Sequence, residues 1–374
     1  MSNTRGPRSS SPAEPASVSP AVRTIATAAL ALTSLAAIPS TIANAATVGP
    51  TATPTVSAGP SRHATPTKKP TASAKPTKTP TKSPTPAATG SGTPTTNAGI
   101  WHPALASRWQ YQLEANSKYS ATGGVNVDIC AVPQSGGACV RPAVFDIDLY
   151  AGDGTTLNTA AVNAIHARGA KAICYIDAGS IEDFRPDYKQ FTDWDKAHGN
   201  SLLGKPFSDE FPNERWANIN NDQGQRDFLL KMMKARVDKC ASAGFDGVEF
   251  DVVNAHEEGK SVTGWTVTPA TQLIYNRALA ALAHAKGMSV ALKNDLSQAK
   301  ELEPDFDYAI NEECYQYDEC SALNVFVKAG KPVFHVEYET ATNSFCAGTT
   351  KLSFNSIKKS SDYSLKDSPY TPCR

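Results

Sequence analysis

Residues 244–254 read Gly-Phe-Asp-Gly-Val-Glu-Phe-Asp-Val-Val-Asn, an apolar and β-branched run that opens with glycine and carries carboxylates. The apolar positions predict a buried strand. Side chains alternate along a strand, so Glu249 and Asp251 share one face while Phe250 and Val252 share the other. Burying unpaired carboxylates is unfavourable. Two interpretations follow: a salt-bridged pair at a strand end, or a pair of acids held at the mouth of a barrel.

Strand-like runs of this kind recur through residues 100–374, with helical patterns between several of them. The patterns at 158–168, 223–243, 269–286 and 321–329 each end directly before a glycine, the residue that most often follows a helix. This alternation predicts a (β/α)8 barrel of the TIM type. An open doubly wound sheet is the alternative, but no GxGxxG motif supports it. The eight expected strands cover 108–113, 143–150, 170–179, 245–254, 288–294, 306–314, 332–338 and 351–359.

Catalytic groups of a barrel lie at the carboxyl ends of its strands, and here those ends are rich in polar side chains. One carboxylate at a strand end can simply cap the next helix. Several such ends on one rim predict a polar cleft for a hydroxylated or amino-bearing ligand. The side chains concerned are Asp146, Asp148, Tyr150, Tyr175, Asp177, Glu249, Asp251, Lys293, Asn294, Asp295, Asn311, Glu312, Glu313, His335, Glu337 and Tyr338.

The first 99 residues differ from the rest in composition and charge. They hold nine of the 36 Lys and Arg residues but only one of the 36 acids, Glu14. Residues 100–374 therefore hold 27 basic and 35 acidic residues, a net charge of −8. An acidic surface argues against nucleic acid as a partner and suits a cationic or neutral ligand.

Three arginines precede an apolar run at about 25–38, and Ala43-Asn44-Ala45 follows as a small-x-small cleavage site. This order predicts a signal peptide over 1–45, hence a secreted protein, extracellular or associated with the cell wall. A retained N-terminal anchor is the alternative, although the run is short for a membrane span. Residues 46–99, rich in Thr, Pro, Ser and Lys, predict a disordered linker. The expected folded domain is 100–374, without a membrane segment after cleavage and monomeric.

All eight cysteines lie between positions 130 and 373, and an even number in an exported chain predicts disulfides. Short loops favour two pairs, Cys130–Cys139 and Cys314–Cys320. The remaining cysteines would then form Cys346–Cys373 and Cys174–Cys240. No CxxC pair with a nearby histidine completes a zinc site, so neither a metal nor another cofactor is expected. Calcium or magnesium bound by rim carboxylates stays open.

Two carboxylates on different strands are what glycoside hydrolysis requires, one protonated as the acid and one ionised as nucleophile or base. Other routes find less support. The seven histidines are scattered and only His335 lies near an expected rim, which disfavours a Ser-His-Asp hydrolase. Trp216 and Trp265 are candidates for stacking on sugar rings, whereas Trp109 is expected in the core.

Several ordered motifs resemble those of the endo-α-1,4-polygalactosaminidase family of glycoside hydrolases, over essentially all of 107–360. The resemblance implies a TIM-type barrel that hydrolyses internal linkages of a galactosamine-rich exopolysaccharide. The motifs are Asp-Ile-Asp-Leu at 146–149, Ile-Cys-Tyr-Ile-Asp-Ala-Gly-Ser at 173–180, Phe-Asp-Gly-Val-Glu-Phe-Asp at 245–251, Leu-Lys-Asn at 292–294, Asn-Glu-Glu-Cys at 311–314 with Cys320, and Gly-Lys-Pro-Val-Phe at 330–334 with Glu337-Tyr338.

By this resemblance, Asp251 is the expected nucleophile or base and Glu312 the expected proton donor. Glu249 competes for the role of Asp251, but Asp251 lies nearer the rim. A non-catalytic carbohydrate-binding barrel and a hydrolase of another amino-sugar glycan are the alternatives. The side chains expected to line the sugar subsite are Asp148, Tyr175, Asp177, Glu249, Lys293, Asn294, Glu337 and Tyr338.

Overall fold

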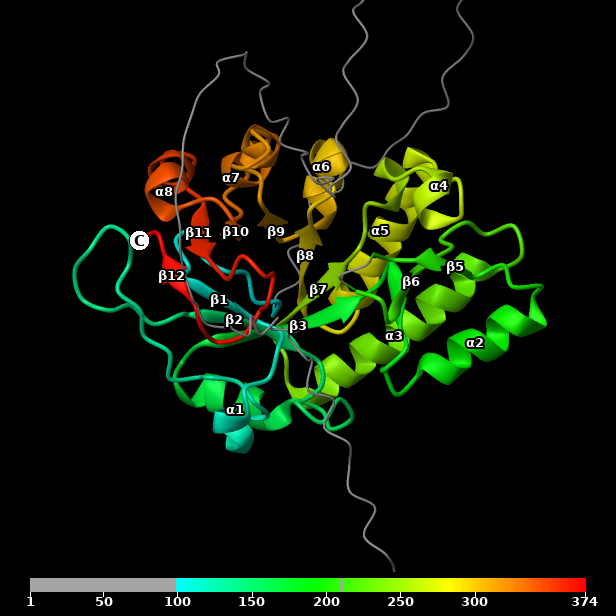
Figure 1. Ribbon diagram of the computed structural model, residues 1–374, viewed down its shortest axis with the longest axis horizontal. Helices are drawn as coiled ribbons and strands as arrows, with labels where there is room; N and C mark the ends of the chain where they lie inside the picture. Colours follow the sequence, from blue (N-terminus) through cyan, green and yellow to red (C-terminus); the bar gives the residue numbers. More distant parts are fainter. Residues whose placement is uncertain (1–98, 209–210) are drawn as a thin grey trace, which may run out of the picture. The chain divides into compact units, whose positions relative to one another are not determined.

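The computed structural model describes residues 99–208 and 211–374 (Figure 1). The signal peptide expected at 1–45 lies outside the described residues, and so does nearly all of the linker expected at 46–99. Within the described part of the chain, no helix combines the length and the apolar character needed to cross a bilayer.

The predicted barrel sheet is confirmed: a nine-stranded sheet contains eight parallel strands in chain order, and each falls within one of the eight expected runs. A last short strand pairs antiparallel with the eighth parallel one. In sheet order the strands are β1 (Trp109–Gln112), β2 (Val144–Asp148), β3 (Lys171–Asp177), β7 (Gly247–Asp251), β8 (Ser289–Lys293), β9 (Tyr308–Glu312), β10 (Val333–Glu337), β11 (Asn355–Lys358) and β12 (Thr371–Pro372).

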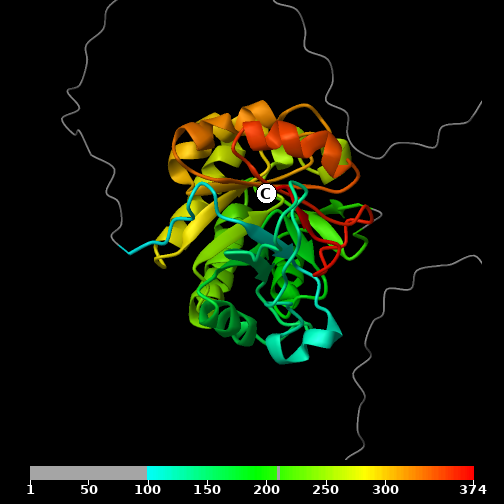
Figure 2. The same ribbon diagram turned by 90° about the vertical axis from the view of Figure 1, so that its left-hand side faces the viewer.

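The sheet curls until its first strand meets the end of the chain, and side chains join the two. Trp109 Nε1 donates to the carbonyl of Asn355 on β11 at 2.8 Å. Tyr370, next to β12, donates its hydroxyl to the carbonyl of Trp109 at 3.0 Å. Both views show β1 in cyan beside the red C-terminal segment (Figures 1 and 2). The seam thus closes through side chains and the C-terminal segment.

Helices follow most of the parallel strands, and four of them are the predicted ones: α1 (Thr159–Ala167), α3 (Gln225–Ala243), α5 (Pro269–His284) and α7 (Asn324–Lys328). The Thr268 hydroxyl caps α5 by accepting from the Thr271 N–H at 3.1 Å. Gly244 closes α3 at a φ of +91°, where glycine is favoured. The sequence patterns missed α2 (Tyr188–Ala197), α4 (Lys260–Thr263), α6 (Ala299–Leu302) and α8 (Thr342–Lys351).

A second sheet, which the sequence analysis did not predict, is inserted between β3 and α3. Its three antiparallel strands stand in the order β4 (Ser180–Glu182), β6 (Glu214–Ala217), β5 (Leu203–Pro206). β4 begins three residues after β3 ends, so the insert starts at the carboxyl end of the barrel. It therefore adds its own side chains to the rim where catalytic groups are expected.

Two apolar layers hold the sheet. Val248 and Phe250 point outward into the layer between strands and helices, while Trp109 and Phe334 lie in the layer inside the barrel. Trp109 stacks on Phe334 with ring centroids 5.2 Å apart, which confirms its expected place in the core. The alternation expected for 244–254 is confirmed as well, because Glu249 faces the inner layer.

All four expected disulfides are present: Cys130–Cys139, Cys174–Cys240, Cys314–Cys320 and Cys346–Cys373. Cys174–Cys240 ties β3 to α3, and Cys314–Cys320 closes the loop that follows β9. Such bonds persist in oxidising compartments, in keeping with a protein that works outside the cytoplasm.

Candidate active site

A buried lysine joins three strands at the carboxyl end of the barrel. The side chain of Lys293, the last residue of β8, is 2% exposed. Its Nζ lies 2.8 Å from Asp251 Oδ1, 3.0 Å from Glu312 Oε2 and 3.6 Å from Glu249 Oε1. These carboxylates come from β7 and β9, the two neighbours of β8 in the sheet. One ammonium thus brings together both predicted catalytic residues and the competitor Glu249.

Asp251 is held as a carboxylate by donors on each oxygen. Its Oδ1 accepts from Lys293 Nζ at 2.8 Å and from the Val252 N–H at 2.8 Å, and its Oδ2 accepts from the Tyr175 hydroxyl at 3.0 Å. Burial alone raises the pKa of Asp251, but the positive charge of Lys293 and these hydrogen bonds lower it below its ordinary value. Asp251 is therefore ionised at neutral pH.

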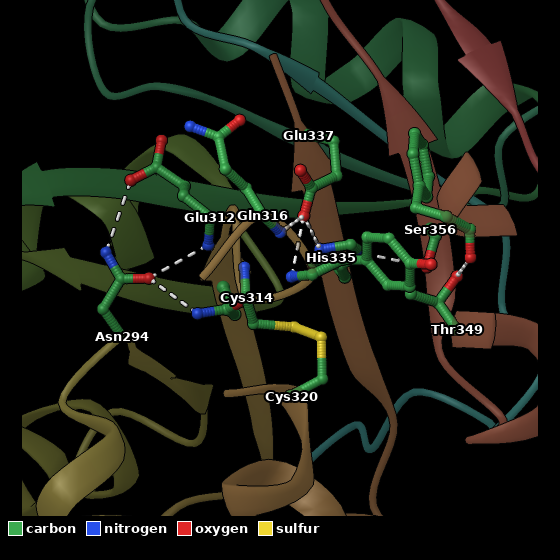
Figure 3. The surroundings of a disulfide bond; sticks show 12 residues. Asn294, Glu312, Cys314, Gln316, Cys320, His335, Glu337, Thr349 and Ser356 are labelled. Atoms are coloured by element: carbon green, nitrogen blue, oxygen red, sulfur yellow. Dashed lines mark hydrogen bonds and ion pairs between the residues drawn. A yellow bond between two sulfur atoms is a disulfide. The ribbon is translucent and has the colours of Figure 1, made fainter. Parts of the chain in front are cut away.

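Glu312 is the more accessible member of the pair, with 28% of its side chain exposed against 20% for Asp251. Its Oε1 accepts from the Tyr338 hydroxyl at 2.5 Å. Its Oε2 accepts from Asn294 Nδ2 at 3.3 Å (Figure 3). The sum of the two distances to Lys293 Nζ places Asp251 Oδ1 and Glu312 Oε2 at most 5.8 Å apart.

Glu249 lies deeper than Asp251 and is fully buried. Its Oε1 accepts from the Tyr111 hydroxyl at 3.0 Å, and the carboxyl of Asp146 is equally buried. Burial and the charge of Glu249 raise the pKa of Asp146. Burial, opposed by Lys293 and reinforced by Asp251, raises the pKa of Glu249 to about 7. The pair therefore forms a buried floor beneath Asp251, away from solvent.

Glu337 was expected in the sugar subsite, and the structure corrects this expectation. The side chain is fully buried on the face of β10 that points to the helices, where its Oε1 accepts from the Tyr315 N–H at 2.9 Å and from His335 at 2.8 Å (Figure 3). It thereby fixes the loop closed by the disulfide Cys314–Cys320. Neighbouring Tyr338, on the other face, does reach Glu312.

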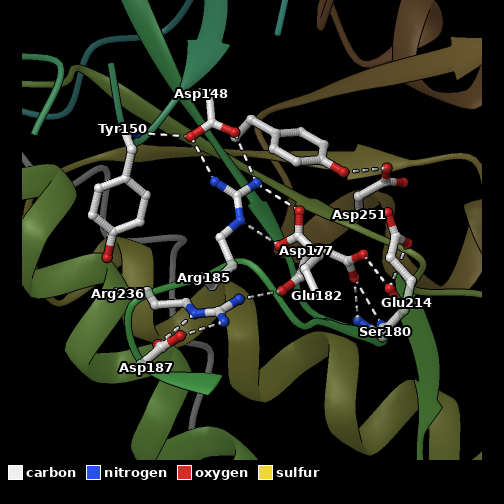
Figure 4. A network of polar contacts seen from close by, with 12 residues as sticks. Asp148, Tyr150, Asp177, Ser180, Glu182, Arg185, Asp187, Glu214, Arg236 and Asp251 are labelled. Carbon is white, nitrogen blue, oxygen red and sulfur yellow. Dashed lines mark hydrogen bonds and ion pairs between the residues drawn. The ribbon is translucent and has the colours of Figure 1, made fainter. Parts of the chain in front are cut away.

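Asp148 does lie on the rim, where an arginine from the insert holds it. Arg185 Nη1 and Nη2 donate to the two Asp148 oxygens at 2.7 and 2.8 Å, and its Nε donates to Glu182 Oε2 at 2.6 Å (Figure 4). This bidentate geometry fixes the Asp148 carboxylate. Sequence reasoning missed Arg185 and Glu182 because neither ends a recognisable strand.

A hydroxyl joins two further acids beside Asp251. Ser180 Oγ contacts Asp177 Oδ2, and it lies 2.8 Å from Glu214 Oε2 (Figure 4). One hydroxyl supplies one proton, so a carboxyl proton must complete the second bond. Burial and the charge of Glu182 raise the pKa of Glu214 to about 7. Burial and the charge of Glu214 raise the pKa of Asp177 as well.

The backbone after β3 approaches β7 so closely that only glycine fits. The N–H groups of Ala178 and Gly179 lie 3.1 and 3.2 Å from the carbonyl of Asp251. A Cβ on Gly179 would lie 1.7 Å from the carbonyl oxygen of Val252. Gly179 thus lets the backbone of Asp251 be held from β3.

The tryptophans expected to stack on sugar are only partly available. Trp216 is buried and packs on Phe207 with ring centroids 4.7 Å apart, and Trp265 is half-buried against the core. More exposed aromatic rings come from the loop after Glu312, where Tyr315 and Tyr317 are 38% and 43% exposed. Their position directly after the Asn-Glu-Glu-Cys motif could have pointed to them.

Replacing Glu214 by glutamine should stabilise the protein at pH 8 and have little effect at pH 5. The folded pKa of about 7 exceeds the ordinary value of 4.5, so stability is lost as pH rises through this window. Glutamine still accepts from Ser180 but carries no charge. Thermal unfolding of the parent and of E214Q at both pH values measures the effect, with exposed Asp227→Asn as the one-charge control. An equal shift of Tm at both pH values would contradict the pKa assigned to Glu214.

Comparison with the solved structure of Ega3 supports the same barrel. Ega3 from Aspergillus fumigatus, crystallised in complex with galactosamine, is 27% identical and aligns with a TM-score of 0.58 over 74% of this chain and 98% of its own. The glycoside hydrolase domain of PelA from Pseudomonas aeruginosa is 12% identical, with a TM-score of 0.45 over 69% of this chain and 96% of its own.

No curated protein matches the chain in sequence. The sequence model of glycoside-hydrolase family GH114, in contrast, matches residues 90–374, a span that includes every strand of the barrel and all the site residues described above. The chain therefore belongs to glycoside-hydrolase family GH114 and is a glycosidase.

Proposed function

We propose that the protein cleaves internal α-1,4 linkages of a galactosamine-rich exopolysaccharide outside the cell, with Asp251 as nucleophile and Glu312 as acid and base. The observation that carries the proposal is the double contact of Lys293 Nζ, at 2.8 Å from Asp251 and 3.0 Å from Glu312. It holds two carboxylates from different strands at one point of the rim, as glycoside hydrolysis requires.

The surroundings of the two carboxylates support their different roles. Asp251 receives three hydrogen bonds and has a lowered pKa, which suits a group that attacks the anomeric carbon as an anion. Glu312 is more exposed, which suits a group that gives its proton to the glycosidic oxygen and later takes one from water. The covalent bond to Asp251 breaks when that water attacks.

The spacing of the carboxylates supports retention of configuration. The nearest oxygens of Asp251 and Glu312 are at most 5.8 Å apart. Retaining glycosidases keep their two carboxyl groups about 5–5.5 Å apart, whereas inverting enzymes need about 6.5–9.5 Å for a water molecule. Asp251 is therefore assigned as a nucleophile rather than as a base.

Charge supports an amino sugar as the substrate. Residues 100–374 carry a net charge of −8. The ammonium groups of a deacetylated galactosamine polymer are attracted by such a field. The complex of Ega3 with galactosamine points the same way.

Two features support export of the protein from the cell: its disulfides and its N-terminal sequence. Four disulfides in residues 130–373 suit an oxidising environment. The apolar run at 25–38 with Ala43-Asn44-Ala45 has the order of a signal peptide. Sequencing the N-terminus of the protein recovered from culture medium would locate the cleavage site.

The variants D251N and E312Q should each reduce depolymerisation of a purified galactosamine polymer by at least about 10²-fold, because each removes one proton-transfer or nucleophilic group. The measured quantity is the rate of new reducing ends, with product masses to show whether internal linkages are cut. Asp227→Asn, an exposed change on α3, should retain the parent rate.

Three outcomes of this assay separate the alternatives. If the parent binds the polymer but releases no reducing ends, the barrel is a binding module. If it cleaves only another amino-sugar polymer, such as chitosan, the substrate assignment is wrong. If D251N and E312Q cleave at the parent rate, the catalytic pair lies elsewhere.

Retention of the anomeric configuration should be visible in the first product of hydrolysis. Proton NMR during early hydrolysis should show the α-anomer of the new reducing end before mutarotation, because two displacements at the anomeric carbon restore its configuration. Initial formation of the β-anomer would mean that Asp251 activates water directly.

A further inference from the structure

A second cluster of metal-ligating side chains lies in the loops that directly follow β7 and β8. His256 and Glu257 belong to the short 3-10 turn η2 (Ala255–Glu257) after β7, and Asp295 follows Lys293 by two residues after β8. Each side chain offers one ligand atom, and the three atoms lie within 4.8 Å of one another. None of these residues belongs to the proposed catalytic pair.

The side chains of Asp295 and His256, the two buried members of this cluster, each have one atom without a hydrogen-bond partner among the described residues. Asp295 is fully buried; its Oδ2 accepts from Asn276 Nδ2 at 2.9 Å, but its Oδ1 has no hydrogen-bond partner among the described residues. The ring of His256 lies beside it, with Nε2 at 3.8 Å from Oδ1, too far for a hydrogen bond. His256 Nδ1 is also buried without a partner in the described part of the chain. Asp295 Oδ1 and His256 Nδ1 are thus two potential ligand atoms without a hydrogen bond, while His256 Nε2 lies 3.0 Å from Ser297 Oγ.

Negative charge gathers around the same place. Glu258 and Glu319 both interact electrostatically with Glu257. Over residues 99–208 and 211–374, no lysine or arginine forms an ion pair with Glu257, Glu258, Glu319 or Asp295. Asp148 on the same rim, in contrast, has Arg185 as a basic partner. A cation would complete this cluster.

We propose that His256, Glu257 and Asp295 bind one divalent transition-metal ion, of the Mn²⁺ or Zn²⁺ class, that ties the β7 loop to the β8 loop. One imidazole and two carboxylates form the mixed nitrogen and oxygen set that these ions accept, whereas Ca²⁺ prefers oxygen ligands throughout. Ligands at about 2.0–2.2 Å from one ion are at most about 4.4 Å apart. The three ligand atoms, all within 4.8 Å of one another, lie close to that limit, and water completes the coordination.

The role of the ion follows from its place in the fold. The β7 loop continues from Asp251 and the β8 loop from Lys293, so the ion would cross-link the two segments that carry the central ion pair. Asn276 of α5, which holds Asp295 Oδ2 and also donates to the Val253 carbonyl at 2.9 Å, orients the ligand from behind. The site is a structural clamp and takes no part in bond cleavage, so it stands independently of the proposed substrate.

A second group of potential metal ligands, Cys314, Cys320 and His335, has all its ligand atoms already bonded. Cys314, Cys320 and His335 also lie within 4.8 Å of one another, but the two sulfurs are joined in a disulfide and supply no thiolate. His335 is hydrogen-bonded at both ring nitrogens, to Ser356 and to Glu337. That cluster is therefore complete without an ion.

Titration calorimetry tests the proposal on the full chain after EDTA treatment and dialysis, with MnCl2, ZnCl2 and CaCl2 as separate probes. The expected result is one Mn²⁺ or Zn²⁺ ion per chain, weaker binding of Ca²⁺, and a Tm that rises with the concentration of the bound ion. Titration with Co²⁺ should produce visible absorption bands that report ligation by nitrogen and oxygen. Absence of binding near one ion per chain would overturn the proposal.

Matched variants locate the ion. The variant E257Q changes an exposed side chain and should fold like the parent, yet bind the ion at least about tenfold more weakly. The variant H256A should lose the Co²⁺ bands. His166→Ala, which removes a histidine paired with Asp246 on another part of the surface, should bind like the parent. Equal binding by E257Q, H256A and the parent would place the ion elsewhere and contradict the assignment.

Discussion

A single buried ammonium organises the catalytic end of this barrel. Lys293 is 2% exposed, and burying an unpaired lysine would be strongly unfavourable. The carboxyl groups of Asp251, Glu312 and Glu249 surround the ammonium at 2.8, 3.0 and 3.6 Å and compensate its charge. Because β7, β8 and β9 are adjacent in a parallel sheet, residues distant in the chain meet at one height on the rim. Fold and chemistry thus depend on the same contacts.

The neighbouring groups hold this centre from three sides. Gly179 allows the β3 backbone to bind the carbonyl of Asp251, and the Tyr175 hydroxyl orients its side chain. The pKa values of the buried Asp146 and Glu249 are both raised, so this floor beneath Asp251 carries less negative charge than two free carboxylates would. Tyr338 and Asn294 fix Glu312 by hydrogen bonds to its two carboxylate oxygens. Each contact restricts the position of a reacting oxygen, which is the main contribution that a rigid scaffold makes to catalysis.

The barrel and its central residues could be predicted from sequence because each parallel strand is an apolar run with a polar end. Lys293, Asp251 and Glu312 stand at such ends, so the rule that places chemistry at the carboxyl end finds them directly. Glu337 was misplaced because both faces of β10 are buried, and its sequence therefore does not show which face points inward. The inserted sheet was missed because its strands have three or four residues and little alternation. Arg185 and Glu214 belong to this insert and were missed for the same reason. Only contacts with residues distant in the sequence bring them to the rim.

The most direct test of the central ion pair is the pH dependence of kcat/KM in a Lys293→Gln variant. The account predicts that the acidic limb, set by ionisation of Asp251, moves to higher pH by about 1–3 units, because a nearby positive charge lowers a carboxyl pKa by that amount. It also predicts a lower maximal rate, with the folded structure retained by circular dichroism. An acidic limb at the parent position, with the rate preserved, would show that Lys293 does not hold the catalytic carboxylates.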